Sequence, residues 1–140
     1  MGSTGGTFYA LNELTGATLW SVTLAGPVTA AANIASAYVS VGDGAGHVSS
    51  LSVSDGTLKG ALSIGHPVTG LVSTLGINIA STANGRLVLR RAPTGAVETW
   101  IYGGATSSYV APGVILNGEF LVAAGNGQLQ AFAIPGRSLY

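Results

Sequence analysis

The sequence predicts an all-β fold of short antiparallel strands, and three observations support this prediction. Runs rich in β-branched and aromatic residues recur along the chain, as in Thr7–Leu11. Glycine accounts for 22 of the 140 residues, a share that suits many tight turns. No segment places apolar residues at the helical spacing of roughly 3.6 residues. We therefore expect essentially no helix, in a chain long enough for one domain with a real core.

Dipeptides typical of tight turns separate the apolar runs. Asn-Gly and Asp-Gly readily adopt the left-handed backbone that two-residue hairpin turns need. Five such pairs occur, at Asp43-Gly44, Asp55-Gly56, Asn84-Gly85, Asn117-Gly118 and Asn126-Gly127. Their positions between the apolar runs predict successive β-hairpins.

This strand and turn pattern repeats about every forty residues. The turn glycines Gly16, Gly56, Gly95 and Gly136 are 40, 39 and 41 residues apart. Pro27-Val28-Thr29 recurs 40 residues later as Pro67-Val68-Thr69. A period of about 40 residues with about four short strands is typical of β-propeller blades.

The repeat divides the chain into blades of four strands, A (inner) to D (outer), about three blades per chain. Residues 1–4 are expected to be a foreign tail, and 5–140 a partial propeller. The hairpin 7–23 supplies strands C and D of an incomplete blade, 28–63 and 68–102 are full blades, and 107–134 is a last partial blade. Thirteen strands are expected, at Thr7–Asn12, Thr18–Thr23, Val28–Ala32, Ala37–Val41, His47–Val53, Leu58–Ser63, Val68–Ser73, Asn78–Thr82, Arg86–Arg91, Val97–Tyr102, Ser107–Ala111, Glu119–Ala124 and Gln128–Ile134.

The first hairpin carries a recognisable motif. Ala10, Asn12, Thr15, Gly16 and Trp20 follow the spacing A-x-D-x-x-T-G-x-x-x-W, with Asn12 in the place of the Asp. This pattern resembles the tryptophan-docking repeat of quinoprotein-like (PQQ-like) β-propellers. The resemblance implies a C-terminal, three-blade fragment of such a bacterial protein, with Trp20 as a structural wedge between blades. It also favours a periplasmic or extracellular location, although no signal peptide is evident in this chain.

Later copies of the motif have diverged. In the second copy Ser50, Ser52, Asp55 and Gly56 take the first four positions, and Gly60 stands where the tryptophan would be. In the third copy Thr94-Gly95 is retained, but Trp100 lies one residue further along than Trp20 does. A shift of one residue along a strand moves a side chain to the opposite face. Trp100 therefore either requires a bulge or lies on the face opposite to that of Trp20.

Composition excludes several classes of function. Five basic and five acidic residues give a net charge of zero, so the electrostatic footprint of a nucleic-acid or acidic-membrane binder is absent. The mean hydropathy is +0.50, yet no run reaches the roughly 18 apolar residues that span a bilayer. With no cysteine there is neither a disulfide nor a thiolate nucleophile. Motifs for acyl or phosphoryl transfer are missing, as are metal-ligand spacings.

Two residues are candidates for contact with a ligand in the central channel. His66 precedes Pro67 at the start of an inner strand, and Tyr109 lies on the last inner strand. The alternative for His66, as for His47, is a solvated loop residue. Arg86 and Arg90 share a strand face and Arg91 points the other way. These arginines form either a phosphate or acidic-partner patch or, more simply, a solvated strand flank.

Two main functional hypotheses follow. The first is a non-enzymatic interaction scaffold within a larger PQQ-like repeat protein. The second is a fragment of a PQQ-dependent dehydrogenase that has lost its cofactor site. The resemblance implies that such enzymes use a calcium-held quinone, an Asp base, a stacking Trp and often a vicinal Cys pair, and this chain supplies no such set. A small lectin-like propeller is a further alternative. We expect no cofactor and no bound metal.

An open arc of blades leaves an apolar face at each end, which monomers avoid. The ring must therefore be completed, either by further blades of a parent protein or by self-association. Two chains would make six to seven blades, so a dimer is the favoured homo-oligomer.

Overall fold

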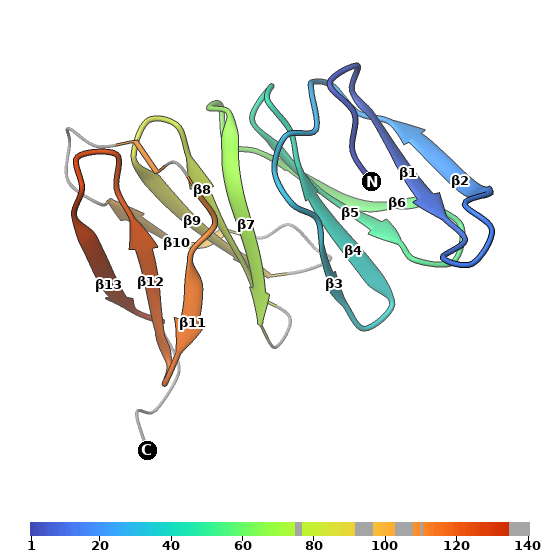
Figure 1. Ribbon diagram of the computed structural model, residues 1–140. Coiled ribbons are helices and arrows are strands. Elements are labelled where there is room, and N and C mark those ends of the chain that lie inside the picture. Colours follow the sequence, from blue (N-terminus) through green and yellow to red (C-terminus); the bar gives the residue numbers. More distant parts are fainter. Residues whose placement is uncertain (75–76, 92–96, 103–107, 110, 135–140) are drawn as a thin grey trace.

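The computed structural model contains four antiparallel sheets that stand side by side in chain order (Figure 1). It describes residues 1–74, 77–91, 97–102, 108–109 and 111–134, with the backbone alone for Arg91 and Val97–Tyr102. These described residues form thirteen strands and no helix. The chain is thus an all-β arc of about three propeller blades, as the sequence predicts.

Each sheet is a meander of consecutive strands. The first blade has β1 (Thr7–Leu11) and β2 (Thr18–Thr23). The second has β3 (Asn33–Ala35), β4 (Tyr38–Gly42), β5 (His47–Ser52) and β6 (Leu58–Ser63). The third has β7 (Val68–Thr74), β8 (Ile77–Thr82), β9 (Arg86–Arg91) and β10 (Val97–Tyr102), and the last has β11 (Val114–Leu116), β12 (Glu119–Ala123) and β13 (Leu129–Ala133).

Two inner strands lie later in the sequence than expected. The second blade begins its sheet at β3 rather than at Val28–Ala32, since its ladder with β4 covers Asn33–Ala35 alone, while the Val28 N–H donates to the Ser3 carbonyl of the first blade (2.9 Å). In the last blade Tyr109 makes one isolated bridge with Ala124, and the continuous strand is β11. Ser107 and Val110 of the predicted strand Ser107–Ala111 lie outside the described residues. In the third blade the inner strand β7 runs from Val68 to Thr74 and pairs with β8, with a register shift between Val68 and Gly70.

Residues 1–3, which the sequence analysis places in a foreign tail 1–4, pair with the first blade. Gly2 bridges to Phe8, and Met1 exchanges backbone hydrogen bonds with Tyr9 (2.7 and 2.8 Å). The Ser3 carbonyl accepts from Val28 N, as the Asp43 carbonyl accepts from Val68 N (3.1 Å). Met1, Gly2 and Ser3 therefore correspond to Val41, Gly42 and Asp43. They form the end of a strand B in the first blade.

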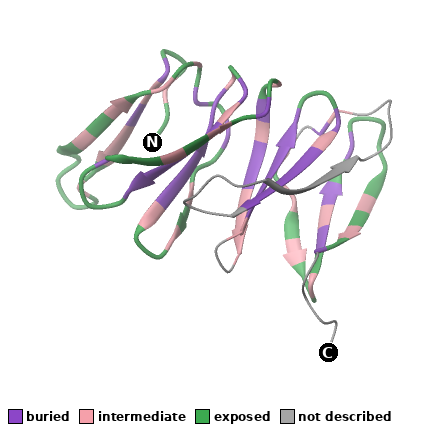
Figure 2. Ribbon diagram, turned by 180° about the vertical axis from the view of Figure 1, so that it is seen from behind, coloured by how far each residue is buried: buried purple, intermediate pink, exposed green. Residues whose placement is uncertain are grey.

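The core is divided among the contacts between consecutive blades (Figure 2). Phe8, Val28, Val39, Val41 and Leu51 pack between the first and second blades. Separate clusters lie between the second and third blades, around Val48 and Leu71, and between the third and last, around Leu87 and Phe120. Each fully buried side chain contributes about 1.5–3 kcal/mol. Face-to-face packing of neighbouring blades therefore holds the arc together.

Candidate interaction surfaces

The turn between β1 and β2 closes through the polar residues of the motif. The Asn12 Oδ1 accepts from the backbone N–H groups of Leu14 and Thr15, each at 3.0 Å. The Thr15 hydroxyl accepts from Ala17 N (3.3 Å), and Gly16 has φ of 71°. The Asn12 amide oxygen thus caps the turn, as the carboxylate of an Asp at this position could.

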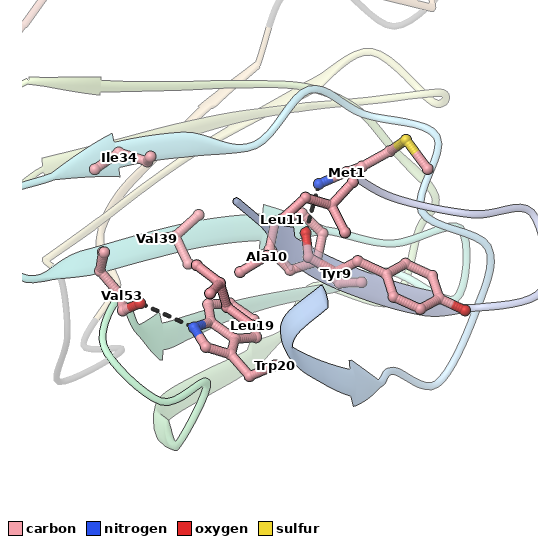
Figure 3. Close-up of a pocket in the computed structure, with 10 residues that line it drawn as sticks. Met1, Tyr9, Ala10, Leu11, Leu19, Trp20, Ile34, Val39 and Val53 are labelled. Atoms are coloured by element: carbon pink, nitrogen blue, oxygen red, sulfur yellow. Dashed lines mark hydrogen bonds between the residues drawn. The ribbon is translucent and has the colours of Figure 1, made fainter. Parts of the chain in front are cut away.

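Trp20 joins the first blade to the second (Figure 3). Its indole N–H donates to the Val53 carbonyl at 2.9 Å. Its ring lies over Gly56, where an added Cβ would stand 2.6 Å from Trp20 Cε3. Phe8 packs beside it, with ring centroids 6.0 Å apart. Ala10 is the cross-strand partner of Trp20 and is half-buried.

A mostly apolar pocket of about 310 Å³ lies beside this contact (Figure 3). Trp20, Ala10 and Leu11 line it from the first blade, and Ile34, Val39 and Val53 from the second. Met1 also lines it. The pocket occupies the side of β1 on which a complete blade has its A and B strands.

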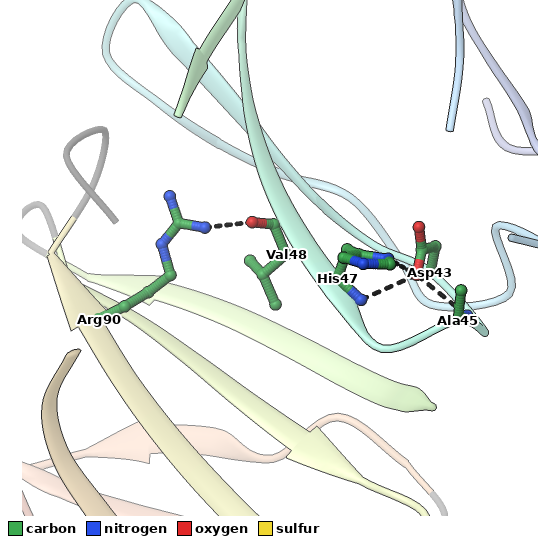
Figure 4. Close-up of polar contacts among 5 residues, drawn as sticks. All are labelled: Asp43, Ala45, His47, Val48 and Arg90. Atoms are coloured by element: carbon green, nitrogen blue, oxygen red, sulfur yellow. Dashed lines mark hydrogen bonds and ion pairs between the residues drawn. The ribbon is translucent and has the colours of Figure 1, made fainter. Parts of the chain in front are cut away.

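Arg90 is fully buried and links the third blade to the second (Figure 4). Its guanidinium donates to the Val48 carbonyl and to the Ser50 hydroxyl, the latter at 2.9 Å. Burial lowers its pKa. The prediction of a solvated flank is therefore wrong for Arg90, because the position packs against the neighbouring blade. Arg86 is half-buried, and the side chain of Arg91 lies outside the described residues.

The strand registers show why Arg90 is buried. Val39 pairs with Leu51, Asn78 with Arg90, and Phe120 with Phe132. These three pairs are equivalent, and each faces the preceding blade. Arg90 thus occupies the position of Leu51, and its guanidinium meets Ser50, whose cross-strand partner is Gly60.

A second buried polar contact crosses the same boundary. Asn78 Nδ2 donates to the Ser40 hydroxyl at 2.8 Å, and the Ser73 hydroxyl donates to Asn78 Oδ1 at 2.6 Å. Between the inner strands β3 and β7, Asn33 Nδ2 donates to the Leu71 carbonyl at 2.5 Å. The contact between the second and third blades is therefore specified partly by hydrogen bonds, since each buried polar group needs a partner.

The histidines lie at blade turns. Asp43 Oδ1 accepts from the backbone N–H groups of Ala45 and His47, and His47 Nδ1 lies 3.4 Å from it (Figure 4). Asp43 thus closes the β4–β5 turn. His66 is half-buried in the β6–β7 connection, with its backbone against Gly46. Neither histidine lines the Trp20 pocket.

Tyr109 is fully buried in the core between the third and last blades, which differs from the predicted channel-facing position. Its hydroxyl donates to Gln130 Oε1 at 2.7 Å. Burial raises its pKa. The side chain therefore packs and bonds within the protein rather than facing an open channel.

Both ends of the arc expose apolar residues at positions that are buried elsewhere. Leu129 is 70% exposed, whereas its counterpart Leu87 in the third blade is fully buried. At the first blade Met1 is 72% and Leu11 39% exposed, whereas their counterparts Val41 and Leu51 are fully buried. We call these surfaces the first end face (Met1, Leu11) and the last end face (Leu129 with Leu121 and Ala131).

Within the described part of the chain, no group of three or more acidic or histidine side chains is placed to hold a metal ion. The same residues include no apolar helix of the length needed to cross a membrane. The candidate sites are therefore surfaces and a pocket between blades rather than a cluster of chemical groups.

Known structures show the same fold. BamB from Moraxella catarrhalis superimposes with a TM-score of 0.82 and 23% identity, over 94% of this chain and 41% of that one. The computationally designed Ika4 protein gives 0.83 and 23%, over 95% and 82%, and Saccharomyces cerevisiae Sqt1 gives 0.83 and 19%, over 96% and 40%. This chain thus spans about two fifths of BamB and of Sqt1. No family model and no curated protein matches the sequence.

Sequence reasoning located the motif hairpin but missed the Trp20 pocket and the buried Arg90. One signal for Arg90 was present, because Gly60 leaves room where the first copy has a tryptophan. The pocket itself was not predicted, although the hairpin 7–23 was expected to supply only strands C and D of its blade.

Proposed function

We propose that this chain is a non-enzymatic β-propeller module of the PQQ-like repeat type, serving as a protein-interaction scaffold. The contacts of Trp20 with Gly56 and Val53 support this family, because they are those expected of a tryptophan docked between blades. An exported location is proposed with it, on the family resemblance alone.

We further propose that the arc closes its ring by self-association, with a dimer favoured. The observation that carries this proposal is the exposure of Leu129 and Met1 at positions whose counterparts are fully buried. In a closed ring the last end face of one copy packs against the first end face of another copy, as consecutive blades pack within one chain. Head-to-tail contacts of this kind form a closed ring when two arcs together complete a full turn about the central axis.

Mass measurement by light scattering or sedimentation tests the closure. We expect a dimer at micromolar concentration, and we expect Leu129→Lys to shift it to monomer, because a charge buried between apolar faces is costly. Leu14→Lys is the matched control, since Leu14 is 89% exposed in the turn between β1 and β2. A wild-type monomer, or equal effects of the two substitutions, would contradict closure through these faces.

A titration with PQQ and Ca²⁺ separates the scaffold from the dehydrogenase alternative. We expect no saturable change in quinone absorbance. Tight binding would contradict the non-enzymatic proposal without affecting the mass result.

A further inference from the structure

A second pocket, of about 240 Å³, lies between the outer strands of the first and second blades. One wall is the end of β2 with the residues that follow it, and the other is the β4–β5 turn with β5 and β6. We call this site the outer pocket, and it is lined by Val22, Thr23, Leu24, Ala25, Asp43, His47, Ser49, Leu58 and Ala61. None of these residues lines the Trp20 pocket or belongs to an end face.

The strand registers explain why the outer pocket is present. Ser49 on β5 pairs with Ala61 on β6, and the equivalent Val88 on β9 pairs with Trp100 on β10. The equivalence follows from the matching β4–β5 and β8–β9 ladders. The second blade therefore has a serine and an alanine at the two positions where the third blade has a valine and a tryptophan.

The corresponding place between the second and third blades is closely packed. Leu24 follows β2 as Ile64 follows β6, and each donates its backbone N–H at 2.8 Å to the carbonyl of the glycine before strand C of its own blade. Ile64 and Val88 are buried members of one apolar cluster, whereas Leu24 is only half-buried. An apolar contact at one boundary is thus replaced at the other by space beside the Ser49 side chain.

Two buried residues bring hydrogen-bond acceptors to the outer pocket. Asp43 is 1% exposed, and its Oδ1 accepts from two backbone N–H groups of the β4–β5 turn (Figure 4). Ser49 is 6% exposed. Among the described residues, none donates to Asp43 Oδ2 and none forms a hydrogen bond with the Ser49 hydroxyl. Because buried polar groups ordinarily have partners, this pair favours a ligand that donates a hydrogen bond.

We propose that the outer pocket binds a small aromatic molecule that carries an N–H donor, with indole as the simplest example. The ring lies between Leu24 and Ala61, at the position where the next blade has Trp100. Its N–H donates to the Asp43 carboxylate, because hydrogen bonds to charged acceptors are the stronger ones. Leu58 and Ala61 are exposed, so the ligand enters from the surface beside β6.

This inference rests neither on the scaffold role nor on ring closure, because both walls of the outer pocket belong to one chain. The mass measurement and the ligand titration can therefore succeed or fail separately.

Nuclear magnetic resonance of the ¹⁵N-labelled full chain, titrated with indole, tests the site. We expect saturable shifts concentrated at the amide signals of lining residues such as Leu24, Ser49 and Ala61. Benzofuran has nearly the same shape but no N–H. It should bind about tenfold more weakly, the value of one lost hydrogen bond of about 1.4 kcal/mol.

Ala61→Trp copies the third blade and should fill the outer pocket, so we expect it to abolish the indole-dependent shifts. Ala17→Trp is the matched control, because it places the same side chain in the exposed turn between β1 and β2, and it should bind indole as wild type does.

Asp43→Thr separates the carboxylate from the turn. Thr82 holds the equivalent position in the third blade, where its hydroxyl accepts from the Arg86 N–H as Asp43 Oδ1 accepts from the His47 N–H. We therefore expect Asp43→Thr to keep the fold and to weaken indole binding about tenfold.

Circular dichroism reports whether each variant folds, and if Ala61→Trp does not, Asp43→Thr and benzofuran decide the matter. Three results would overturn the assignment: no saturable shift with indole, equal binding of benzofuran and indole, or undiminished binding to folded Ala61→Trp.

Discussion

At the scale of single residues, Gly56 and Gly16 differ in one respect that matters. Both have a left-handed backbone, with φ of 73° and 71°. A Cβ on Gly56 would meet the Trp20 ring, whereas a Cβ on Gly16 would meet nothing within 4 Å. The pair therefore separates backbone strain from the contact between blades.

We expect Gly16→Ala to lower the free energy of unfolding by about 1–2 kcal/mol through left-handed strain alone. Gly56→Ala should cost about 1–3 kcal/mol more, because it overpacks the indole. Urea denaturation of the two variants measures the difference. Repeating both substitutions in a Trp20→Ala background should remove it, and an undiminished difference would contradict the docking role of Trp20.

Buried Arg90 shows how a polar side chain replaces an apolar contact. In the first contact Trp20 reaches forward to the Val53 carbonyl, and in the second Arg90 reaches back to the Val48 carbonyl. Both arrangements join a long side chain to a backbone acceptor of the second blade. The second and third blades are therefore joined through Arg90, although Gly60 stands where the first blade has a tryptophan.

At the scale of elements, the turns of the first two blades make the same hydrogen bond with different chemistry. Thr15 accepts from Ala17 N, and the equivalent Asp55 accepts from Thr57 N at 2.9 Å. The Thr57 N–H, with smaller help from the Ser52 hydroxyl, lowers the pKa of Asp55 from 3.8 to about 2. The second turn is therefore sensitive to acid where the first is not.

The sign of the pH effect follows from the lowered pKa. Ionised Asp55 stabilises the fold above pH 4, and this contribution is lost as the pH falls from about 4 through about 2. We expect the melting temperatures of wild type and Asp55→Asn to converge over that interval. Asp55→Thr, which copies the first turn, should show no such loss from this position. Thermal unfolding at pH 5, 4, 3 and 2 measures both, and a gap that is constant with pH would refute the assignment.

At the scale of the whole molecule, the sequence was sufficient for the fold because its repeat is visible in turn residues. Leu58–Ser63, Arg86–Arg91 and Val97–Tyr102 have the predicted bounds. The inner strand of the second blade was misplaced because propensity does not encode where a ladder begins, since Val28 and Val68 both donate to the preceding blade but only Val68 also pairs within its own sheet. The place of residues 1–3 in the repeat was missed because Ser3 and Asp43 are different residue types, although the Ser3 hydroxyl accepts from Thr7 N (3.0 Å) as the Asp43 carboxylate accepts from His47 N (2.9 Å). The burial of Tyr109 depends likewise on packing between blades.

The two end faces make a further prediction about the whole assembly. If unfolding is coupled to dissociation, the melting temperature should rise with protein concentration, because association stabilises the folded state by mass action. We expect this dependence for wild type and for Leu14→Lys, and its loss in Leu129→Lys. Calorimetry over a hundredfold range of concentration measures it, and a flat profile for wild type would contradict a dimer.

The carbonyls of Ser3, Asp43 and Thr82 each accept from a backbone N–H of the following blade, at Val28, Val68 and Tyr109 respectively. Main-chain groups make these joints, and the three side chains share one property, because the Ser3, Asp43 and Thr82 side-chain oxygens accept from the N–H groups of Thr7, His47 and Arg86 respectively. Neighbouring blades can therefore differ in most residues while these contacts are kept. This explains how a chain that matches known architectures closely in shape has diverged so far from them in residues.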